Sequence, residues 1–316
     1  MLQKIKSLKK TYELYNFFQK KYLKHNTPLY KKYGLNKKYY SSISTKDFEG
    51  IKGELNEYDI KNSSELLKND SIFLNLDKKI QDAIINWSDN GYAIIRNFFS
   101  EDQVNLINAE IDTLISTGEL KPRYKAKKYM FANRYSNLIN EISNGEIKNI
   151  LELLLGRKIS LFQTINFENG SQQGTHSDSV HMTTFPKGNL IAVWVALEDI
   201  DEGCGPLHYY PGSHKLPYIM NEDYGNQGDE FYLGNKSYNE YEEKIEELIL
   251  ENNLDKKVFL AKKGDILIWH ANLLHGGNKV NNEGSTRKSM VFHYLADDVI
   301  CYHETTQRPT LKGKFK

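Results

Sequence analysis

The second half of the chain is a series of short apolar segments separated by glycine- and proline-containing turns, and this pattern limits the possible folds more than any other feature. Strand-like stretches cover residues 159–167, 190–197, 207–210, 266–269 and 287–295. The stretch 190–197 is a continuous apolar run, which is typical of a strand that is covered on both faces. Many short strands joined by tight turns predict an antiparallel barrel or sandwich.

Helical patterns precede these strands. Residues 77–87 have apolar side chains at helical spacing, and Asn90-Gly91 then predicts a turn into a strand at 92–96. Ser100 is a candidate N-cap for a helix over 101–116, and a further helix over 145–155 is predicted to end at Gly156. The second half is interrupted by an insertion at 217–257, which contains a charged helix at about 239–250. The order of elements predicts a mainly β domain with flanking helices (α+β).

Residues 1–75 differ from the remainder and are interpreted as a basic, aromatic-rich helical extension. The first forty residues contain eleven lysines and one acidic residue, Glu13. Interleaved aromatic residues predict an amphipathic helix that ends before Asn26-Thr27-Pro28. Its basic face suits weak contact with an anionic membrane surface or a protein, but a solvated helix packed on the main domain through its aromatic residues is favoured. The main domain is predicted to span 76–305, and 306–316 to form a basic C-terminal tail.

Composition sets limits on location and partners. The formal net charge is +1, so no global field attracts the protein to nucleic acid, and no nucleic-acid partner is predicted. Cys204 and Cys301 are the only two cysteines, which offers no disulfide framework and suits a reducing compartment. No secretory signal pattern and no apolar run long enough to cross a bilayer is found. The chain is therefore expected to be cytoplasmic; its oligomeric state is not determined by the sequence.

One short motif and a distant histidine carry the chemistry. In Thr175-His176-Ser177-Asp178, alternation along a strand would project His176 and Asp178 from one face. Together with His275 they offer two imidazoles and one carboxylate, the facial triad of non-haem iron oxygenases, although these ligands also suit zinc or manganese. Arg287 opens the last predicted strand, where its planar guanidinium suits a carboxylate beside the metal. Alternation predicts that Arg287, Ser289, Val291 and His293 face the interior and that Lys288, Met290, Phe292 and Tyr294 pack beneath the helices.

The ordered set of motifs over about residues 85 to 305 resembles the phytanoyl-CoA dioxygenase family. The set consists of His176-x-Asp178, Trp194-Val195-Ala196-Leu197-Glu198-Asp199, Gly205-Pro206-Leu207, Pro211-Gly212-Ser213-His214-Lys215, Gly264-Asp265 and His275 with Arg287. The segment Gly276-Gly277-Asn278 departs from relatives that carry a hydroxyl residue just after the histidine.

The resemblance implies a double-stranded β-helix (a jelly roll, or cupin-like barrel) that uses Fe(II), 2-oxoglutarate and O2. It implies that His176, Asp178 and His275 are the iron ligands and catalytic residues, and that Arg287 binds the distal carboxylate of 2-oxoglutarate. Polar cosubstrate contacts would fall on Gln163, Thr164 or Asn166, with Asn166 preferred and Gln163 placed last. The implied reaction is hydroxylation of a C–H bond in a small or medium organic substrate, with release of succinate and CO2.

Two other classes of protein stay open at this point: a zinc or manganese hydrolase on the same barrel, and a non-catalytic jelly-roll binding protein. Arg287 separates them from the dioxygenase, because a zinc hydrolase has no need of it. The segments 217–257 and 120–135 are the predicted lid regions, and their polar composition suits a polar or sugar-like substrate better than a long acyl chain. A basic and aromatic stretch is interpreted as a solvated lid or as a binding site for an anionic substrate: Lys125, Lys127, Lys128, Tyr129 and Arg134.

Overall fold

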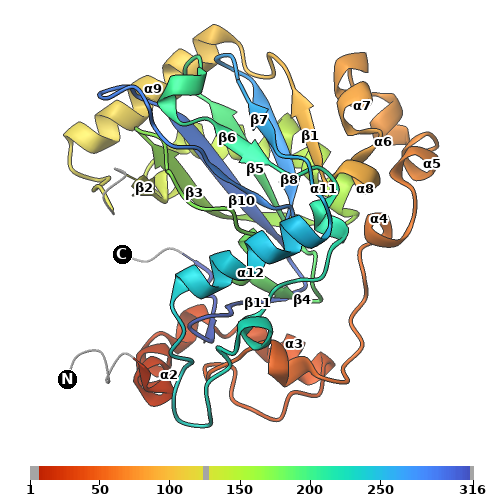
Figure 1. Ribbon diagram of the computed structural model, residues 1–316, viewed down its shortest axis with the longest axis vertical. Coiled ribbons are helices and arrows are strands. Elements are labelled where there is room, and N and C mark those ends of the chain that lie inside the picture. Colours follow the sequence, from red (N-terminus) through yellow and green to blue (C-terminus); the bar gives the residue numbers. More distant parts are fainter. Residues whose placement is uncertain (1–6, 124–127, 314–316) are drawn as a thin grey trace.

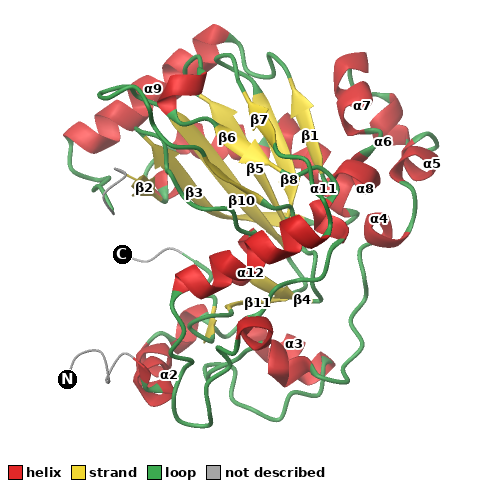
Figure 2. Ribbon diagram, viewed as in Figure 1, coloured by secondary structure: helices red, strands yellow, loops and turns green. Residues whose placement is uncertain are grey.

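The computed structural model describes residues 7–123 and 128–313, and it places twelve strands in three antiparallel sheets. Figures 1 and 2 show the large sheet in the upper part of the molecule, with helices around it. The strands are β1 (Tyr92–Ile95), β2 (Lys128–Met130), β3 (Ile159–Phe167), β4 (Thr183–Phe185), β5 (Leu190–Ala196), β6 (Leu207–Tyr209), β7 (Lys257–Phe259), β8 (Ile266–His270), β9 (His275–Gly277), β10 (Ser289–Ala296), β11 (Ile300–His303) and β12 (Arg308–Pro309).

The largest sheet has six strands in the order β1-β8-β5-β10-β3-β2, so that the longest strands lie at its centre. Two three-stranded sheets complete the β structure, with the orders β7-β6-β9 and β12-β11-β4. Neighbours in the sheet are mostly distant in sequence: β10, for example, pairs with β3 on one side and β5 on the other. Antiparallel sheets with these crossovers and flanking helices confirm the predicted jelly-roll class.

Some of the helices cover one face of the large sheet. The helices are α2 (Lys9–Phe18), α3 (Asn26–Lys32), α4 (Glu57–Ile60), α5 (Ser63–Leu67), α6 (Ser71–Leu74), α7 (Lys78–Ile84), α8 (Trp87–Asn90), α9 (Glu101–Ser116), α10 (Asn137–Asn144), α11 (Glu146–Leu155) and α12 (Tyr238–Glu251), with short 3-10 turns η1–η7 between them. Other helices, among them α2, α3 and α12, lie in the lower part of the molecule as seen in Figure 1. In α9, Ser100 and Gln103 form the capping box that starts the helix. None of the described helices is both long and apolar enough to cross a membrane.

Two apolar cores lie on opposite faces of the large sheet, and alternation along β10 shows why. Met290, Phe292 and Tyr294 pack in the core formed with the helices, as predicted. Val291 packs in the second core, between the large sheet and the sheet that contains β6. Because successive side chains of a strand point to opposite faces, β10 contributes to both cores, and every one of its residues is buried.

The N-terminal extension is built from several short helices. The amphipathic helix expected up to residue 25 ends earlier, at Phe18, and α3 begins at Asn26, where an end was predicted. The lysines among described residues 7–40 are mostly exposed, as expected, and Tyr30 and Phe48 pack against Phe185, Ile300 and Tyr302 of the main domain. This contact supports the packed interpretation, but part of α2 remains uncovered, since Phe18 is 72% exposed.

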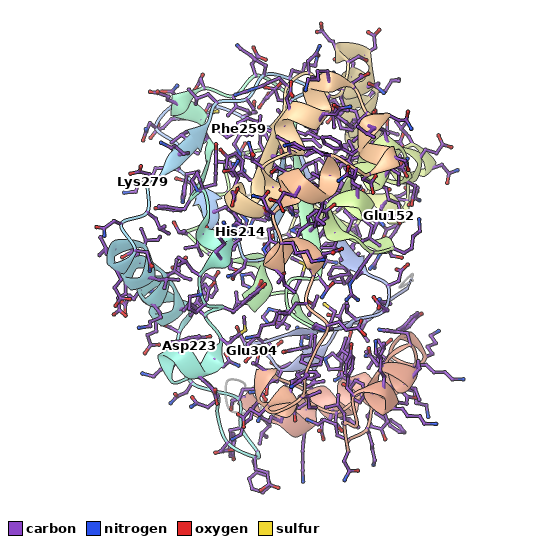
Figure 3. All side chains as sticks on the ribbon, turned by 90° about the vertical axis from the view of Figure 1, so that its right-hand side faces the viewer. Glu152, His214, Asp223, Phe259, Lys279 and Glu304 are labelled. Atoms are coloured by element: carbon purple, nitrogen blue, oxygen red, sulfur yellow. The ribbon has the colours of Figure 1, made fainter. Side chains whose placement is uncertain are left out.

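The insertion and the C-terminal segment join the extension on the same side of the barrel. Helix α12 runs across the barrel above β11 and β4 (Figure 1). The C-terminal residues predicted as a tail include β12, which pairs with β11, and Lys312 N donates to Tyr22 O over 3.1 Å. Figure 3 shows Glu304 where the insertion, near Asp223, meets the N-terminal helices. There the Glu304 carboxylate accepts from Thr45 N and Thr45 Oγ1, both over 3.0 Å.

Candidate active site

His176 and His275 are held opposite each other by the backbone. The two residues form an antiparallel bridge, with His176 N donating to His275 O over 2.9 Å and His275 N donating to His176 O over 3.0 Å. Asp178 begins the 3-10 turn η4 (Asp178–Val180), so the prediction of one strand carrying both His176 and Asp178 is wrong. The Asp178 carboxylate nevertheless lies near both histidines.

The three side chains converge on one position and form a group that could hold a single metal ion. One ligand atom from each lies within 4.8 Å of the others, and Asp178 Oδ1 is 3.8 Å from His176 Nε2 and 3.9 Å from His275 Nε2. His176 Nδ1 lies 2.9 Å from Gly174 O, and His275 Nδ1 lies 2.9 Å from Leu273 O. A carbonyl oxygen only accepts, so Nδ1 carries the hydrogen in both rings and Nε2 presents its lone pair to the shared position.

The protonation states also suit a metal. Burial, and then the neighbouring His275, hold the pKa of His176 well below its ordinary value, so this ring is neutral. Burial alone would raise the pKa of Asp178, but His275 and His293 outweigh it and keep that pKa below its usual range. A neutral imidazole and an ionised carboxylate are the forms that bind a divalent cation.

The free oxygen of Asp178 is held by two buried groups. Trp269 Nε1 donates to Asp178 Oδ2 over 2.7 Å, and His293 Nε2 lies 3.4 Å from the same oxygen. These contacts leave Asp178 Oδ1 directed toward the two histidines. The sequence analysis placed His293 on the interior face of the last strand without giving it a role, and it did not consider Trp269. A usable signal existed, because an indole on a buried strand needs an acceptor for its N–H.

Gln173 lies over the ligand position. Its Nε2 is 3.2 Å from His176 Nε2, so the amide donates to the same lone pair that a metal would use. Its Oε1 is 3.5 Å from Lys128 Nζ. Metal binding at His176 therefore requires the Gln173 amide to turn away.

Arg287 lies in the same cavity as the triad and is only 2% exposed. Its Nη1 donates to Gly205 O over 3.2 Å, its guanidinium lies 5.5 Å from the Phe167 ring centroid, and its Nε has no hydrogen-bond partner among the described residues. Burial lowers the pKa of Arg287 to about 10, so it remains charged at neutral pH. A buried cation without a carboxylate partner is costly, and an anionic ligand in this cavity would offset that cost.

The three polar candidates on β3 divide between its two faces. Asn166 pairs with Met290 and Thr164 with Phe292, so both project toward the helices, away from the triad. Gln163 pairs with His293 on the metal-facing side, and its Nε2 is 3.5 Å from His293 Nδ1. The expected preference for Asn166 over Gln163 is therefore reversed by the strand register.

The basic stretch before the barrel is partly in the site. Lys128 lines the cavity with Arg287, and burial, followed by the Arg287 charge, lowers the pKa of Lys128. Lys125 and Lys127 lie outside the described residues. Tyr129 is buried against the helices, whereas Arg134 lines a separate cleft. No hydroxyl residue follows His275 directly, but Ser171 lines the same cavity, and its Oγ would collide with a Cβ on Gly277.

The insertion contacts the residues around the triad. Tyr241 on α12 accepts a hydrogen bond from Ser177 N over 3.0 Å, and Tyr238 Oη lies 3.0 Å from His181 Nε2. The His181 ring is 5.8 Å from the His176 ring. Helix α12 therefore supports the loop that carries His176 and Asp178. The two histidines, the ionised carboxylate and the buried Arg287, which has no carboxylate partner among the described residues, together fit a divalent metal and an anionic cosubstrate.

Comparisons with known proteins agree with this geometry. The model of the family "Phytanoyl-CoA dioxygenase (PhyH)" matches residues 87–289, more than half of the chain. The rat protein "Phytanoyl-CoA dioxygenase, peroxisomal" is 25% identical over 241 residues, which are 67% of each chain, and the human protein of that name is 22% identical over 240 residues, with the same coverage.

Solved structures share the fold at low sequence identity. The non-haem α-ketoglutarate-dependent carbocyclase SnoK from nogalamycin biosynthesis superposes with a TM-score of 0.59 at 18% identity, covering 77% of this chain and 96% of SnoK. EctD from S. alaskensis, crystallised with 2-oxoglutarate and 5-hydroxyectoine, superposes with a TM-score of 0.53 at 19% identity, covering 72% of this chain and 78% of EctD. On the family match over the residues that contain the whole triad, the chain belongs to the phytanoyl-CoA dioxygenase family.

Proposed function

We propose that His176, Asp178 and His275 bind the Fe(II) of this enzyme and that Arg287 binds the distal carboxylate of 2-oxoglutarate. As a member of its family, the chain is an Fe(II)- and 2-oxoglutarate-dependent dioxygenase, with O2 as the second cosubstrate. The observation that carries the residue assignment is the buried guanidinium of Arg287 in the cavity of the triad, which has no carboxylate hydrogen-bond partner among the residues that the structure describes.

Arg287 also weighs against the alternatives. A zinc or manganese hydrolase needs the three ligands but has no use for a buried arginine beside them. A guanidinium presents a fork of donors that matches a carboxylate bidentately, and 2-oxoglutarate supplies such a carboxylate. Lys128, on the same cavity wall, adds a second positive charge for the cosubstrate.

The protein's own part in the reaction is to position groups and exclude water. When bound, Fe(II) with 2-oxoglutarate and O2 supplies the oxidising power that cleaves a C–H bond, with succinate and CO2 as products. Trp269 and His293 orient the Asp178 carboxylate, while Gly174 O and Leu273 O fix the rings of the two histidines. Apolar side chains around the cavity, including Ile165, Phe167 and Val291, keep it dry.

We propose a small polar or sugar-like substrate, hydroxylated at a C–H bond, rather than a long acyl chain. The insertion that reaches the site contributes Tyr238 and Tyr241, which bring hydroxyl groups to the triad loop. The two free, buried cysteines support a reducing compartment, which we propose to be the cytoplasm. Hydroxylation of phytanoyl-CoA by the purified enzyme would contradict the substrate proposal.

The test of the site is anaerobic titration of metal-free protein with Fe(II) and then 2-oxoglutarate, followed by visible absorption. We expect a metal-to-ligand charge-transfer band in the wild type, no band in His176→Ala and a weakened band in Arg287→Ala. Arg157→Ala is the matched control, because Arg157 is paired with Asp298 outside the cavity. A full-strength band in Arg287→Ala at limiting 2-oxoglutarate would contradict the role given to this arginine.

A further inference from the structure

A cleft of about 780 Å³ adjoins the metal cavity, and it is formed by segments from three distant parts of the sequence. Tyr15 and Gln19 line it from the N-terminal extension, Arg123 and Arg134 from the segment around β2, and Arg308 from β12. Much of this cleft therefore lies outside the residues that match the family model, which end at 289. Arg123 and Arg134 lie within the matched residues, whereas Arg308 and the N-terminal lining residues lie outside them.

The cleft carries positive charge from three arginines, and none of the described residues that line it is acidic. Arg308 is held by neutral groups: its Nε donates to Thr306 Oγ1 over 3.1 Å, and its guanidinium lies 5.2 Å from the Tyr12 ring centroid. Arg134 lies 3.7 Å from the Phe131 ring centroid. Stacking on an aromatic ring fixes the plane of the Arg308 guanidinium and leaves the donors on its edge directed away from the ring.

Two histidines also face the cleft, and both are neutral. Burial lowers the pKa of His181 to about 4 and that of His303 to about 3. Their rings lie 5.5 Å apart. At neutral pH they are hydrogen-bonding groups, so the charge of the cleft comes from the arginines.

A layer of side chains lies between the cleft and the metal site. His181 lines the cleft, and its ring centroid is 5.8 Å from that of His176. Gln163 also lines it and contacts His293, whose Nε2 is 3.4 Å from Asp178 Oδ2. A molecule in the cleft therefore lies one side chain, His181 or Gln163, away from the triad residues and their partners, while the arginines line the same cleft.

We propose that this cleft binds the substrate and that the substrate is a small phosphorylated molecule, whose phosphate is held by Arg123 and Arg308. This inference rests on the proposed function, because it places the reacting carbon beside the iron ligands. A phosphate dianion offers three oxygens, and guanidinium forks match that geometry with charge-assisted hydrogen bonds. Tyr15, Tyr22 and Phe162 supply apolar surface for the body of the molecule.

The experiment is calorimetric titration of the anaerobic Fe(II) enzyme at saturating 2-oxoglutarate, so that Arg287 is already occupied. The probes are fructose 1,6-bisphosphate, coenzyme A, tricarballylate as a polycarboxylate, and glucose as the neutral sugar. We expect the bisphosphate to bind and glucose and tricarballylate to bind at least tenfold more weakly. Weaker binding of the bisphosphate than of coenzyme A would overturn a small substrate, and preference for tricarballylate would overturn a phosphate.

Variants locate the binding. Arg308→Gln and Arg123→Gln are each expected to raise the Kd of the bisphosphate about tenfold or more, the loss of a charge-assisted hydrogen bond. Arg123 is exposed, so its substitution is not expected to disturb folding. Arg157→Gln removes the same charge outside the cleft, from an arginine already paired with Asp298, and should leave the Kd unchanged. An unchanged Kd in both cleft variants would overturn the site.

Failure of the cleft proposal can be distinguished from failure of the proposed function. The charge-transfer band of the Fe(II) and 2-oxoglutarate complex is recorded in the same sample before the titration. A missing band contradicts the proposed function. A normal band without bisphosphate binding contradicts only the assignment of the cleft.

Discussion

Trp269→Phe tests whether the Asp178 carboxylate is oriented by its indole partner. The substitution keeps an aromatic ring at a buried position and removes the 2.7 Å hydrogen bond from Trp269 Nε1 to Asp178 Oδ2. A hydrogen bond to a charged group contributes about 1.5–3 kcal/mol, and each 1.4 kcal/mol corresponds to about a tenfold change in binding. Partners of metal ligands typically change metal affinity by about 10–100-fold. We therefore expect the Kd for Fe(II) to rise by about that factor.

The assay is anaerobic titration of the metal-free protein with Fe(II), without 2-oxoglutarate, read by calorimetry. The matched control is Trp194→Phe on the neighbouring strand β5. Trp194 is buried to the same degree, and its Nε1 has no hydrogen-bond partner among described residues, so its substitution removes similar volume and no bond. An equal Kd for Fe(II) in the wild type and Trp269→Phe would refute a specific role for the indole hydrogen bond. An equal loss of Fe(II) affinity in Trp269→Phe and Trp194→Phe would refute it as well.

Three further predictions concern stability. Arg287→Leu is expected to abolish 2-oxoglutarate binding and to stabilise the metal-free protein by up to about 1–4 kcal/mol, measured by chemical denaturation. The reason is that it removes a buried charge that has no carboxylate partner among the described residues. A lower stability of the variant would mean that the charge has a partner in the folded state. Burial raises the pKa of the Glu304 carboxyl above its ordinary 4.5, so the folded state holds the proton more tightly than the unfolded state. The stability of the wild type relative to Glu304→Gln should therefore fall as the pH rises from 4.5 through the pKa of Glu304 in the folded state. Thermal unfolding measured across this pH range checks the prediction, and a relative stability that rises with pH would contradict it. Tyr241→Phe leaves Ser177 N without its acceptor and should cost about 1–3 kcal/mol, measured by denaturation; no loss would show that α12 does not support the triad loop.

The strand pattern and the chemistry of the metal ligands were accessible from the sequence. The expected strand at 159–167 coincides with β3, and the helix over 101–116 coincides with α9, because each has strong periodicity and a clear boundary signal. The residue types of His176, Asp178, His275 and Arg287 were enough to predict the chemistry proposed above without any coordinates. Alternation along the last strand also assigned its two faces correctly.

The face of β3 that meets the metal was decided only by tertiary structure. Gln163 and Asn166 lie on opposite faces, and helices cover one face while the cavity lies on the other. A strand covered on both sides lacks the contrast between polar and apolar faces that would orient it, so only its register with β10 settles the choice. The 3-10 turn at Asp178 was missed although it has a local cap, since the Ser177 side chain accepts from Ser179 N; contacts from α12 and β8 add to it.

The sequence by itself determined which local elements form and which chemistry the ligands support, because periodicity, caps and side-chain functional groups are local properties. Only the tertiary structure decided what surrounds that chemistry. The indole that holds Asp178 is 91 residues away from it, and the cleft joins Tyr15, Arg134 and Arg308. Such contacts arise when distant segments pack to bury a common apolar surface, and no spacing within one segment encodes them.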